Sequence, residues 1–178
     1  MKKSDDRRRY LVVGGTGMLA PFCRTLPGEE VIVAARFRSN KERVRSLDLR
    51  IERVSLDYLD EASGTAFLDR LRDWHKLTHC VLWVHSVGHG FSQRLIKALA
   101  NRRDPPLIVH LFGSNADSDR LIEAALAAKV PFSPVRLGHV NTPTGWRWMT
   151  DDEISTLTAK ALMGPAGTDL SPEIRARS

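Results

Sequence analysis

The sequence predicts an α/β fold, a doubly wound parallel sheet with the strand order 3-2-1-4-5-6 in three layers. Short segments of strand length, most of them apolar and the third one alternating, occur six times and alternate with segments of helical spacing. Parallel strands joined by right-handed crossover helices produce this alternation. A glycine-rich turn, residues 14–17, directly follows the first apolar segment. The longest apolar runs have the length of strands, so none is expected to span a bilayer.

Three strands and three helices are expected in the first half of the chain. The expected strands are 10–13, 31–35 and 50–56, and the expected helices are 17–26, 41–46 and 60–74. Pro21 falls in the first turn of the first helix, where a missing amide proton costs little, and Pro27-Gly28 ends this helix. Asp60 can cap the third helix.

The second half repeats the pattern with strands at 80–84, 107–112 and 132–137 and helices at 91–99, 117–129 and 151–163. Residues at 91, 95, 96 and 99 give one helix an apolar face. A loop containing Pro143 and Gly145 is expected after the last strand. Thr150 and Glu153 have the spacing of a capping box, which predicts where the last helix begins.

The composition fits one domain over residues 1–163 and a disordered tail over 164–178. The chain has 178 residues, of which 42% are hydrophobic and 27% charged. The tail is rich in Gly, Pro, Ser and charge. The start of the chain lacks the apolar stretch of a signal peptide, and Cys23 and Cys80 lack metal-ligand spacing. We therefore expect a cytoplasmic protein with reduced core thiols, no metal and no membrane association.

The net charge of +6 raises the question of nucleic acid. The basic residues are scattered, however, at 2–3, 7–9, 36–45 and 102–103, without an interleaved aromatic stripe. An anionic cofactor explains the middle cluster better, and no nucleic-acid partner is expected.

The glycine turn has the spacing Gly14-x-x-Gly17-x-x-Ala20, a relative of the dinucleotide fingerprint of the Rossmann fold. Gly14 permits the sharp turn, and Gly17 has no Cβ to keep a pyrophosphate from the first amides of the helix. The same turn between strand and helix can also form without a ligand. The residues expected to bind the cofactor are Gly14, Gly15, Thr16, Gly17, Met18, Leu19, Arg36, Arg38, Ser39, Asp57 and Ser86.

Arg36 follows the second strand, where an acid would bind the ribose of NAD(H) and an arginine a 2′-phosphate. No acid occurs between residues 31 and 41. This pattern favours NADP(H), because a guanidinium can bind a phosphomonoester through two hydrogen bonds. A solvated basic start of a helix is the alternative. Asp57 either accepts a hydrogen bond from the adenine amino group or closes a turn.

Candidate catalytic residues follow the fourth, fifth and sixth strands at His85, Ser114 and His139. An imidazole there can donate a proton near neutral pH. The alternatives are that His85 caps a strand end and Ser114 caps a helix. His110 lies within a strand and is expected to be a satisfied core histidine. The segment 146–148, Trp-Arg-Trp, either walls a substrate pocket or packs the last helix onto the sheet.

These motifs resemble the short-chain dehydrogenase/reductase superfamily over residues 9–163. WVHS at 83–86, LGHV at 137–140 and RWMTDDEIS at 147–155 resemble a small bacterial branch of it. The resemblance implies that the chain binds NAD(P), but it does not indicate a substrate. It also implies a possible homodimer, since many relatives pair through the helices here expected near 91–99 and 121–126.

The sequence departs from the superfamily at the catalytic pair. Most members carry Tyr-x-x-x-Lys on the helix after the fifth strand, which here reads DSDRLIEAALAAK. Tyr10 and Tyr58 are the only tyrosines, and neither has a lysine four residues later. We expect an NADPH-dependent reductase of a small C=N or conjugated C=C substrate, which needs little acid help. The alternative is a non-catalytic protein that binds NADP(H) to sense redox state or regulate a partner.

Overall fold

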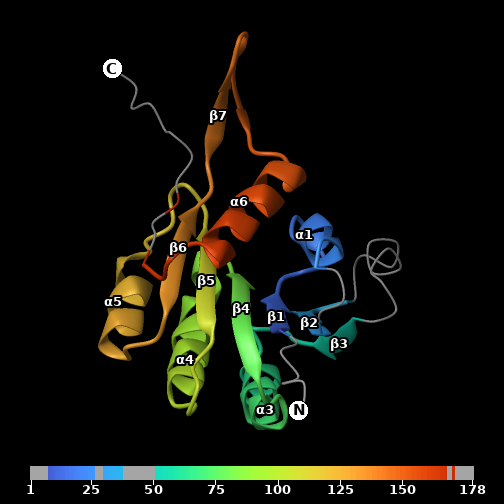
Figure 1. The fold of residues 1–178 in the computed structure, drawn as a ribbon, viewed down its shortest axis with the longest axis vertical. Helices are drawn as coiled ribbons and strands as arrows, with labels where there is room; N and C mark the ends of the chain where they lie inside the picture. The colour runs from blue at the N-terminus through green and yellow to red at the C-terminus, as the bar shows by residue number, and fades with distance from the viewer. Residues whose placement is uncertain (1–7, 27–29, 38–50, 168–169, 171–178) are drawn as a thin grey trace, which may run out of the picture.

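The sheet of the computed structural model has six parallel strands in the predicted order β3-β2-β1-β4-β5-β6 (Figure 1). The structure describes residues 8–26, 30–37, 51–167 and 170. The strands are β1 (Arg9–Val13), β2 (Glu30–Ala35), β3 (Glu52–Ser55), β4 (Leu77–Trp83), β5 (Leu107–Phe112) and β6 (Phe132–Arg136). The expected helix at 41–46 lies outside the described residues.

Helices cover both faces of the sheet, as the alternation predicts. They are α1 (Ala20–Arg24), α3 (Glu61–Arg70), α4 (His89–Ala100), α5 (Asp119–Ala127) and α6 (Asp151–Met163), with short 3₁₀ turns η1 (Leu71–Asp73) and η2 (Ser86–Gly88). One apolar core lies between the sheet and α3, α4 and α5, and the other between the sheet and α1 and α6. Alternate β1 residues feed the two cores, Leu11 and Val13 the first and Tyr10 and Val12 the second.

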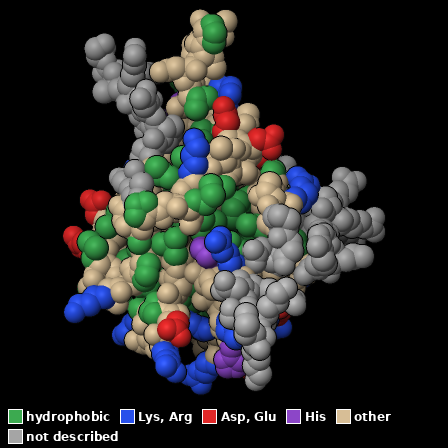
Figure 2. All heavy atoms as spheres, in the orientation of Figure 1, with side chains coloured by type: hydrophobic (Ala, Val, Ile, Leu, Met, Phe, Trp, Pro, Cys, Tyr) green, Lys and Arg blue, Asp and Glu red, His purple; other side chains and the backbone are tan. Residues whose placement is uncertain are grey.

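The space-filling view shows the face that carries α6. Hydrophobic side chains gather at its centre, over the strands beside α6, and Lys and Arg side chains lie along its lower edge (Figure 2). Within the described residues, no helix combines the length and apolar character needed to cross a membrane.

Element boundaries agree best where local chemistry defines them. The last helix begins and ends as predicted, because Thr150 and Glu153 form the capping box in full. The first helix is shorter than the expected 17–26, because residues 14–19 form turns before Ala20. The fourth strand begins three residues earlier than predicted. Its polar start pairs with β1, where His79 stacks on Tyr10 at 4.7 Å between ring centroids.

The expected loop after the sixth strand is instead an antiparallel hairpin. Its strands are β7 (His139–Thr142) and β8 (Gly145–Trp148), and it projects from the body of the molecule (Figure 1). Thr142 pairs with Gly145, so Pro143 and Thr144 form a two-residue turn. The hairpin escapes a prediction from hydrophobic alternation because none of its residues is fully buried.

Two residues of the tail that is expected to be disordered contact β6 of the sheet. The Gly167 amide donates to the Phe132 carbonyl at 2.8 Å. Leu170 forms a parallel bridge with Val135 and accepts a hydrogen bond from the Arg136 amide at 2.9 Å. Gly167 and Leu170 thus contact β6, whereas the expected disorder of the tail as a whole stays a prediction. Residues 168–169 and 171–178 lie outside the described part of the chain.

Candidate functional site

A cavity of about 340 Å³ lies at the carboxyl ends of the four strands β1 to β4. This edge is where open α/β sheets bind ligands, at the point where the strand order reverses between β1 and β4. The cavity is lined by Val13, Gly14, Thr16, Gly17, Ala34, Ala35, Arg36, Phe37, Leu56, Tyr58, Trp83 and His85. Five residues predicted from the sequence are among them: Gly14, Thr16, Gly17, Arg36 and His85.

The first two glycines of the turn have structural reasons. Gly14 has a φ of +84°, and a Cβ built on it would lie 2.6 Å from the Trp83 carbonyl oxygen. Its amide donates to the Ala34 carbonyl at 2.9 Å, which joins the turn to β2. A Cβ on Gly15 would lie 3.1 Å from the Cys23 sulfur. Architecture alone therefore accounts for Gly14 and Gly15.

Gly17 is different, because no packing explains it. A Cβ built there meets no atom of the described residues within 4 Å, and the φ of Gly17 lies outside the left-handed region. Gly17 nevertheless lines the cavity. The missing side chain leaves open space beside the turn, which is where a ligand phosphate would approach the backbone.

The other predicted turn residues lie behind the cavity. Gly15 is buried, Leu19 is fully buried in the core, and Met18 packs against that core. None of these three is among the lining residues.

Arg36 is exposed at the mouth of the cavity, directly after β2. Within the described residues no carboxylate pairs with Arg36, so its guanidinium is available to an anion. The next residue, Phe37, has a φ of +48°, a strained value that turns the chain away from the strand direction. The predicted phosphate contacts Arg38 and Ser39 lie outside the described residues.

Tyr58 and Trp83 line the cavity although the sequence did not single them out. Tyr58 follows β3, and a Cβ on Gly88 would lie 2.5 Å from its ring, so Gly88 makes room for the tyrosine. The Tyr58 ring lies 6.3 Å from that of Phe91. Both lining residues stand at or just after a strand end in the predicted order, and this position was the available signal.

Asp57 closes a turn. Its Oδ1 accepts the Leu59 amide at 3.1 Å, and its own amide donates to Ser63 Oγ at 3.0 Å. It does not line the cavity, and neither does the exposed Ser86. The adenine contact expected of Asp57 and the cofactor contact expected of Ser86 stay predictions.

The three candidate catalytic residues do not meet in this cavity. His85 lines it, with its ring 5.0 Å from that of Trp83 in an edge-on contact. Ser114 is half-buried after β5, and its carbonyl faces Arg136. His139 is exposed on the hairpin, with its ring 4.2 Å from Trp146 and 5.2 Å from Trp148.

The aromatic segment of the hairpin, residues 146–148, does not line this cavity. Trp146 and Trp148 are 58% and 41% exposed. Arg147 instead reaches the start of α6 and donates to both carboxylate oxygens of Glu153, at 2.7 and 2.8 Å. This bidentate pair lowers the pKa of Glu153 to about 2, helped by the Thr150 amide.

His110 is a satisfied core histidine, as predicted. Its Nδ1 lies 3.0 Å from the Leu111 carbonyl and its Nε2 lies 3.1 Å from Ser92 Oγ. The carbonyl can only accept, so Nδ1 carries the proton and Nε2 accepts from the serine. Burial lowers the pKa of His110 to about 3 and keeps the ring neutral.

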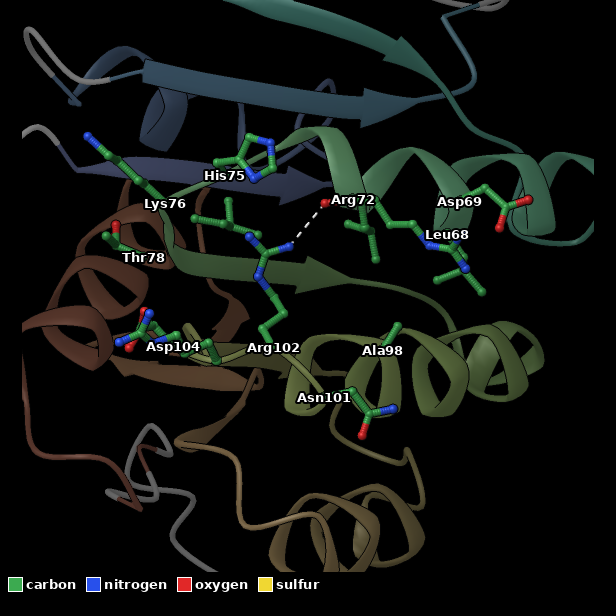
Figure 3. Close-up of a pocket in the computed structure, with 13 residues that line it drawn as sticks. Leu68, Asp69, Arg72, His75, Lys76, Thr78, Ala98, Asn101, Arg102 and Asp104 are labelled. Atoms are coloured by element: carbon green, nitrogen blue, oxygen red, sulfur yellow. Dashed lines mark hydrogen bonds between the residues drawn. The ribbon is translucent and has the colours of Figure 1, made fainter.

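A second, larger cavity of about 890 Å³ lies at the opposite, amino-terminal edge of the sheet (Figure 3). Arg102 lies at its centre and donates to the carbonyls of Leu71 at 3.0 Å and Trp74 at 2.6 Å. The other charged lining residues are Asp69, Arg72, Lys76, Arg103 and Asp104. Arg102 thus satisfies carbonyls at and after the end of α3, where cations are favoured. This role of Arg102 is structural. The candidate site is therefore the smaller cavity, at the carboxyl ends of β1 to β4. Among the described residues no three His, Cys, Asp or Glu side chains form a metal-binding group.

Among the known proteins compared with the chain, solved structures are the ones that match it. No family model matches the chain. No curated protein matches it either. Solved structures with the same fold include 3-hydroxyacyl-CoA dehydrogenase type-2 from Mycobacterium avium, with a TM-score of 0.65, 15% identity and 99% of both chains covered. Another is a short-chain dehydrogenase from Sphingobium yanoikuyae in complex with NADPH, with a TM-score of 0.63, 15% identity, and 95% of this chain and 89% of that chain covered.

A third is the Bordetella bronchiseptica enzyme WbmG in complex with NAD, with a TM-score of 0.56 and 16% identity. The match covers 80% of this chain but only 57% of WbmG. At such identities the likeness concerns the fold. By its strand order, its glycine turn and these neighbours, the chain has a Rossmann-type α/β fold, the fold that these dehydrogenase structures also have.

Proposed function

We propose that the protein binds NADP(H) in the cavity between β1 and β4 and works as an NADPH-dependent reductase. The observation that carries the proposal is the open space at Gly17, a glycine that packing does not require. Arg36 lines the same cavity and has no carboxylate partner among the described residues. The solved structures with this fold include proteins in complex with NAD, NADPH and NADP+.

The residues present fit such a cofactor. The backbone at Gly17 can approach the pyrophosphate, and Arg36 can bind the 2′-phosphate through its planar guanidinium. Tyr58 and Trp83 give the cavity flat apolar walls. When bound, the nicotinamide ring supplies the hydride, so the chain itself needs only to orient the cofactor and manage a proton.

His85 is the residue best placed to manage that proton, because it is the one candidate catalytic residue that lines the cavity. The tyrosines offer no replacement for the missing Tyr-x-x-x-Lys pair. Tyr10 is buried within β1, and Tyr58 lies after β3, on the side of the cavity away from β5. We therefore favour substrates with a protonated C=N or a conjugated C=C bond, which need little help from an acid.

A second candidate is a non-catalytic protein that binds NADP(H) and responds to redox state. The separation of His85 from Ser114 and His139 favours it, because among the described residues these three candidate proton donors do not meet in the cavity.

Titration calorimetry of the pure chain with NADPH and NADH tests the cofactor. We expect NADPH to bind at least tenfold more tightly, and Arg36→Ala to remove this preference by weakening NADPH alone. Arg24→Ala is the matched control, since Arg24 is an exposed cation on α1 outside the cavity. Equal affinities in the wild type would refute the choice of NADP(H), and no binding would refute the dinucleotide site. Loss of NADPH absorbance with imines or enones, but not without them, separates the reductase from the second candidate.

A further inference from the structure

The described residues that line the cavity come from one half of the strand order. It is built from the ends of β3, β2, β1 and β4, and stops at His85. No described residue of β5, β6 or the hairpin lines it. In this strand order the end of β2 binds the adenosine ribose, so these residues surround the adenosine half of a dinucleotide.

The walls on this side are firmly supported. Val13, Ala34 and Leu56 at the strand ends are at most 1% exposed. Tyr58 is backed by Phe91 and fits over a glycine. Such a wall is preorganised, and it costs little ordering entropy when a ligand binds.

The other side is open by comparison. His85, Ser86 and Val87 after β4 are all exposed, Val87 by 76%. A Cβ on Gly113, at the end of β5, would meet no described atom within 4 Å. The described residues therefore surround the adenosine half of the cofactor, but they form no closed cavity around the nicotinamide half.

The loop after β5 is held away from covering this end. Arg136 at the end of β6 donates to the Ala116 carbonyl at 3.1 Å and to Ser118 Oγ at 2.7 Å. Both bonds tie the loop that carries Ser114 to β6, on the side away from β4. Closing the loop over β4 would break them and leave a half-buried guanidinium without its partners.

From this asymmetry, and resting on the proposed function, we infer that the chain holds NADP(H) by its 2′-phosphoadenosine diphosphate half and leaves the nicotinamide ring uncovered. A volume of about 340 Å³ agrees, since it lies near the lower end of the ~300–1,000 Å³ of sites that enclose a small ligand.

An uncovered nicotinamide ring bears on the choice between the two candidate functions. NADP+ and NADPH differ only in the nicotinamide ring, so a protein that does not enclose the ring binds both with nearly equal affinity. When two ligands bind every conformation of a protein equally well, replacing one by the other shifts no conformational equilibrium of the protein. The chain alone would then be a poor sensor of redox state, whereas a reductase that presents its hydride to an incoming substrate is compatible with the open end.

Calorimetry with fragments tests the inference on the whole chain. The ligands are NADPH, NADP+, 2′,5′-ADP and nicotinamide mononucleotide, with Arg36→Ala alongside. We expect the Kd of 2′,5′-ADP and that of NADP+ to lie within tenfold of the Kd of NADPH, with no binding of the mononucleotide. Arg36→Ala should weaken all three adenosine ligands together. The emission of bound NADPH should keep the wavelength and iodide quenching of the free cofactor, because its ring stays in water.

Two results would overturn the inference while the proposed function stands. One is NADPH binding with 2′,5′-ADP more than tenfold weaker. The other is blue-shifted, iodide-protected emission of bound NADPH. Either would mean that residues outside the described part, a moving loop or a second copy encloses the ring. A failure of NADPH and 2′,5′-ADP alike to bind would instead refute the proposed function.

Discussion

A substitution at Gly17 tests whether this glycine serves ligand binding or folding. The perturbation is Gly17→Ala, which adds one methyl group in a space where no described atom lies within 4 Å. The backbone there suits an L-residue, so the methyl meets neither strain nor a clash. Stability and cofactor binding should therefore change in opposite directions.

The stability term follows from the unfolded chain. Replacing glycine by alanine at a compatible position stabilises a protein by about 0.4–1 kcal/mol, because the unfolded chain loses freedom. With a urea m-value of roughly 2 kcal/mol/M, the midpoint should rise by about 0.2–0.5 M. The binding term has the opposite sign. A methyl group against the pyrophosphate should weaken NADPH at least tenfold, which corresponds to about 1.4 kcal/mol.

Urea unfolding followed by tryptophan fluorescence and calorimetry with NADPH measure the two terms on the same preparation. Gly90→Ala is the matched control, because a Cβ there also meets no described atom and Gly90 lies in α4 outside the cavity. It should stabilise the fold and leave NADPH binding unchanged. A Gly17→Ala variant that binds NADPH like the wild type would refute the reasoning, since the open space would then not receive the phosphates. Loss of stability would show instead that the turn itself needs the glycine.

Three further predictions concern the fold around the site. Gly88→Ala should destabilise the protein by about 1–3 kcal/mol in urea unfolding, because its Cβ would lie 2.5 Å from the Tyr58 ring, and an unchanged midpoint would contradict this contact. Burial lowers the pKa of His110 to about 3, so below pH 6.5 the unfolded state binds one more proton. Stability should fall from pH 6.5 toward pH 3 by up to about 1.4 kcal/mol per pH unit, and His110→Gln should lessen this slope; equal slopes would refute the assignment. Thr150→Ala should cost about 1 kcal/mol by removing the cap of α6, whereas Thr150→Ser should retain most of it; equal losses in both would rule out the cap.

The parallel sheet was predictable because its signals are local and repeated. The strands β1, β2 and β5 are short, mainly apolar runs, and right-handed crossovers then leave few possible strand orders. The start of α6 was predictable for the same kind of reason, since Thr150 and Glu153 carry the cap in four residues. The start of β4 was not predictable, because it depends on residues of β1 almost 70 positions away: His79 pairs with Tyr10, and the Thr78 hydroxyl donates to the Arg9 carbonyl.

The cavity could be predicted only in part. Gly14, Gly17 and Arg36 lie at positions where a motif fixes the distance from a strand end. Tyr58 packs over Gly88 and Trp83 packs against Gly14, and these contacts leave no motif in the sequence beyond the positions of both residues at or after strand ends. The hairpin was missed because each of its strands has only four residues and none of these residues is fully buried, so the hydrophobic signal of a strand is weak there.

If the chain binds NADPH as proposed, the absence of a Tyr-x-x-x-Lys pair and an uncovered nicotinamide ring lead to the same class of substrate. Reduction of a ketone creates an oxyanion, which needs positioned donors in a site that excludes water. Reduction of a protonated imine removes a positive charge instead, so neither an oxyanion hole nor a closed site is required. On the proposed function, the exposed His85 then needs only to keep the imine protonated, a task that water can share. Turnover of a cyclic imine that survives His85→Ala with a modest loss, beside a ketone that is not reduced, is the outcome expected. Efficient ketone reduction would mean that a proton donor outside the described residues completes the site.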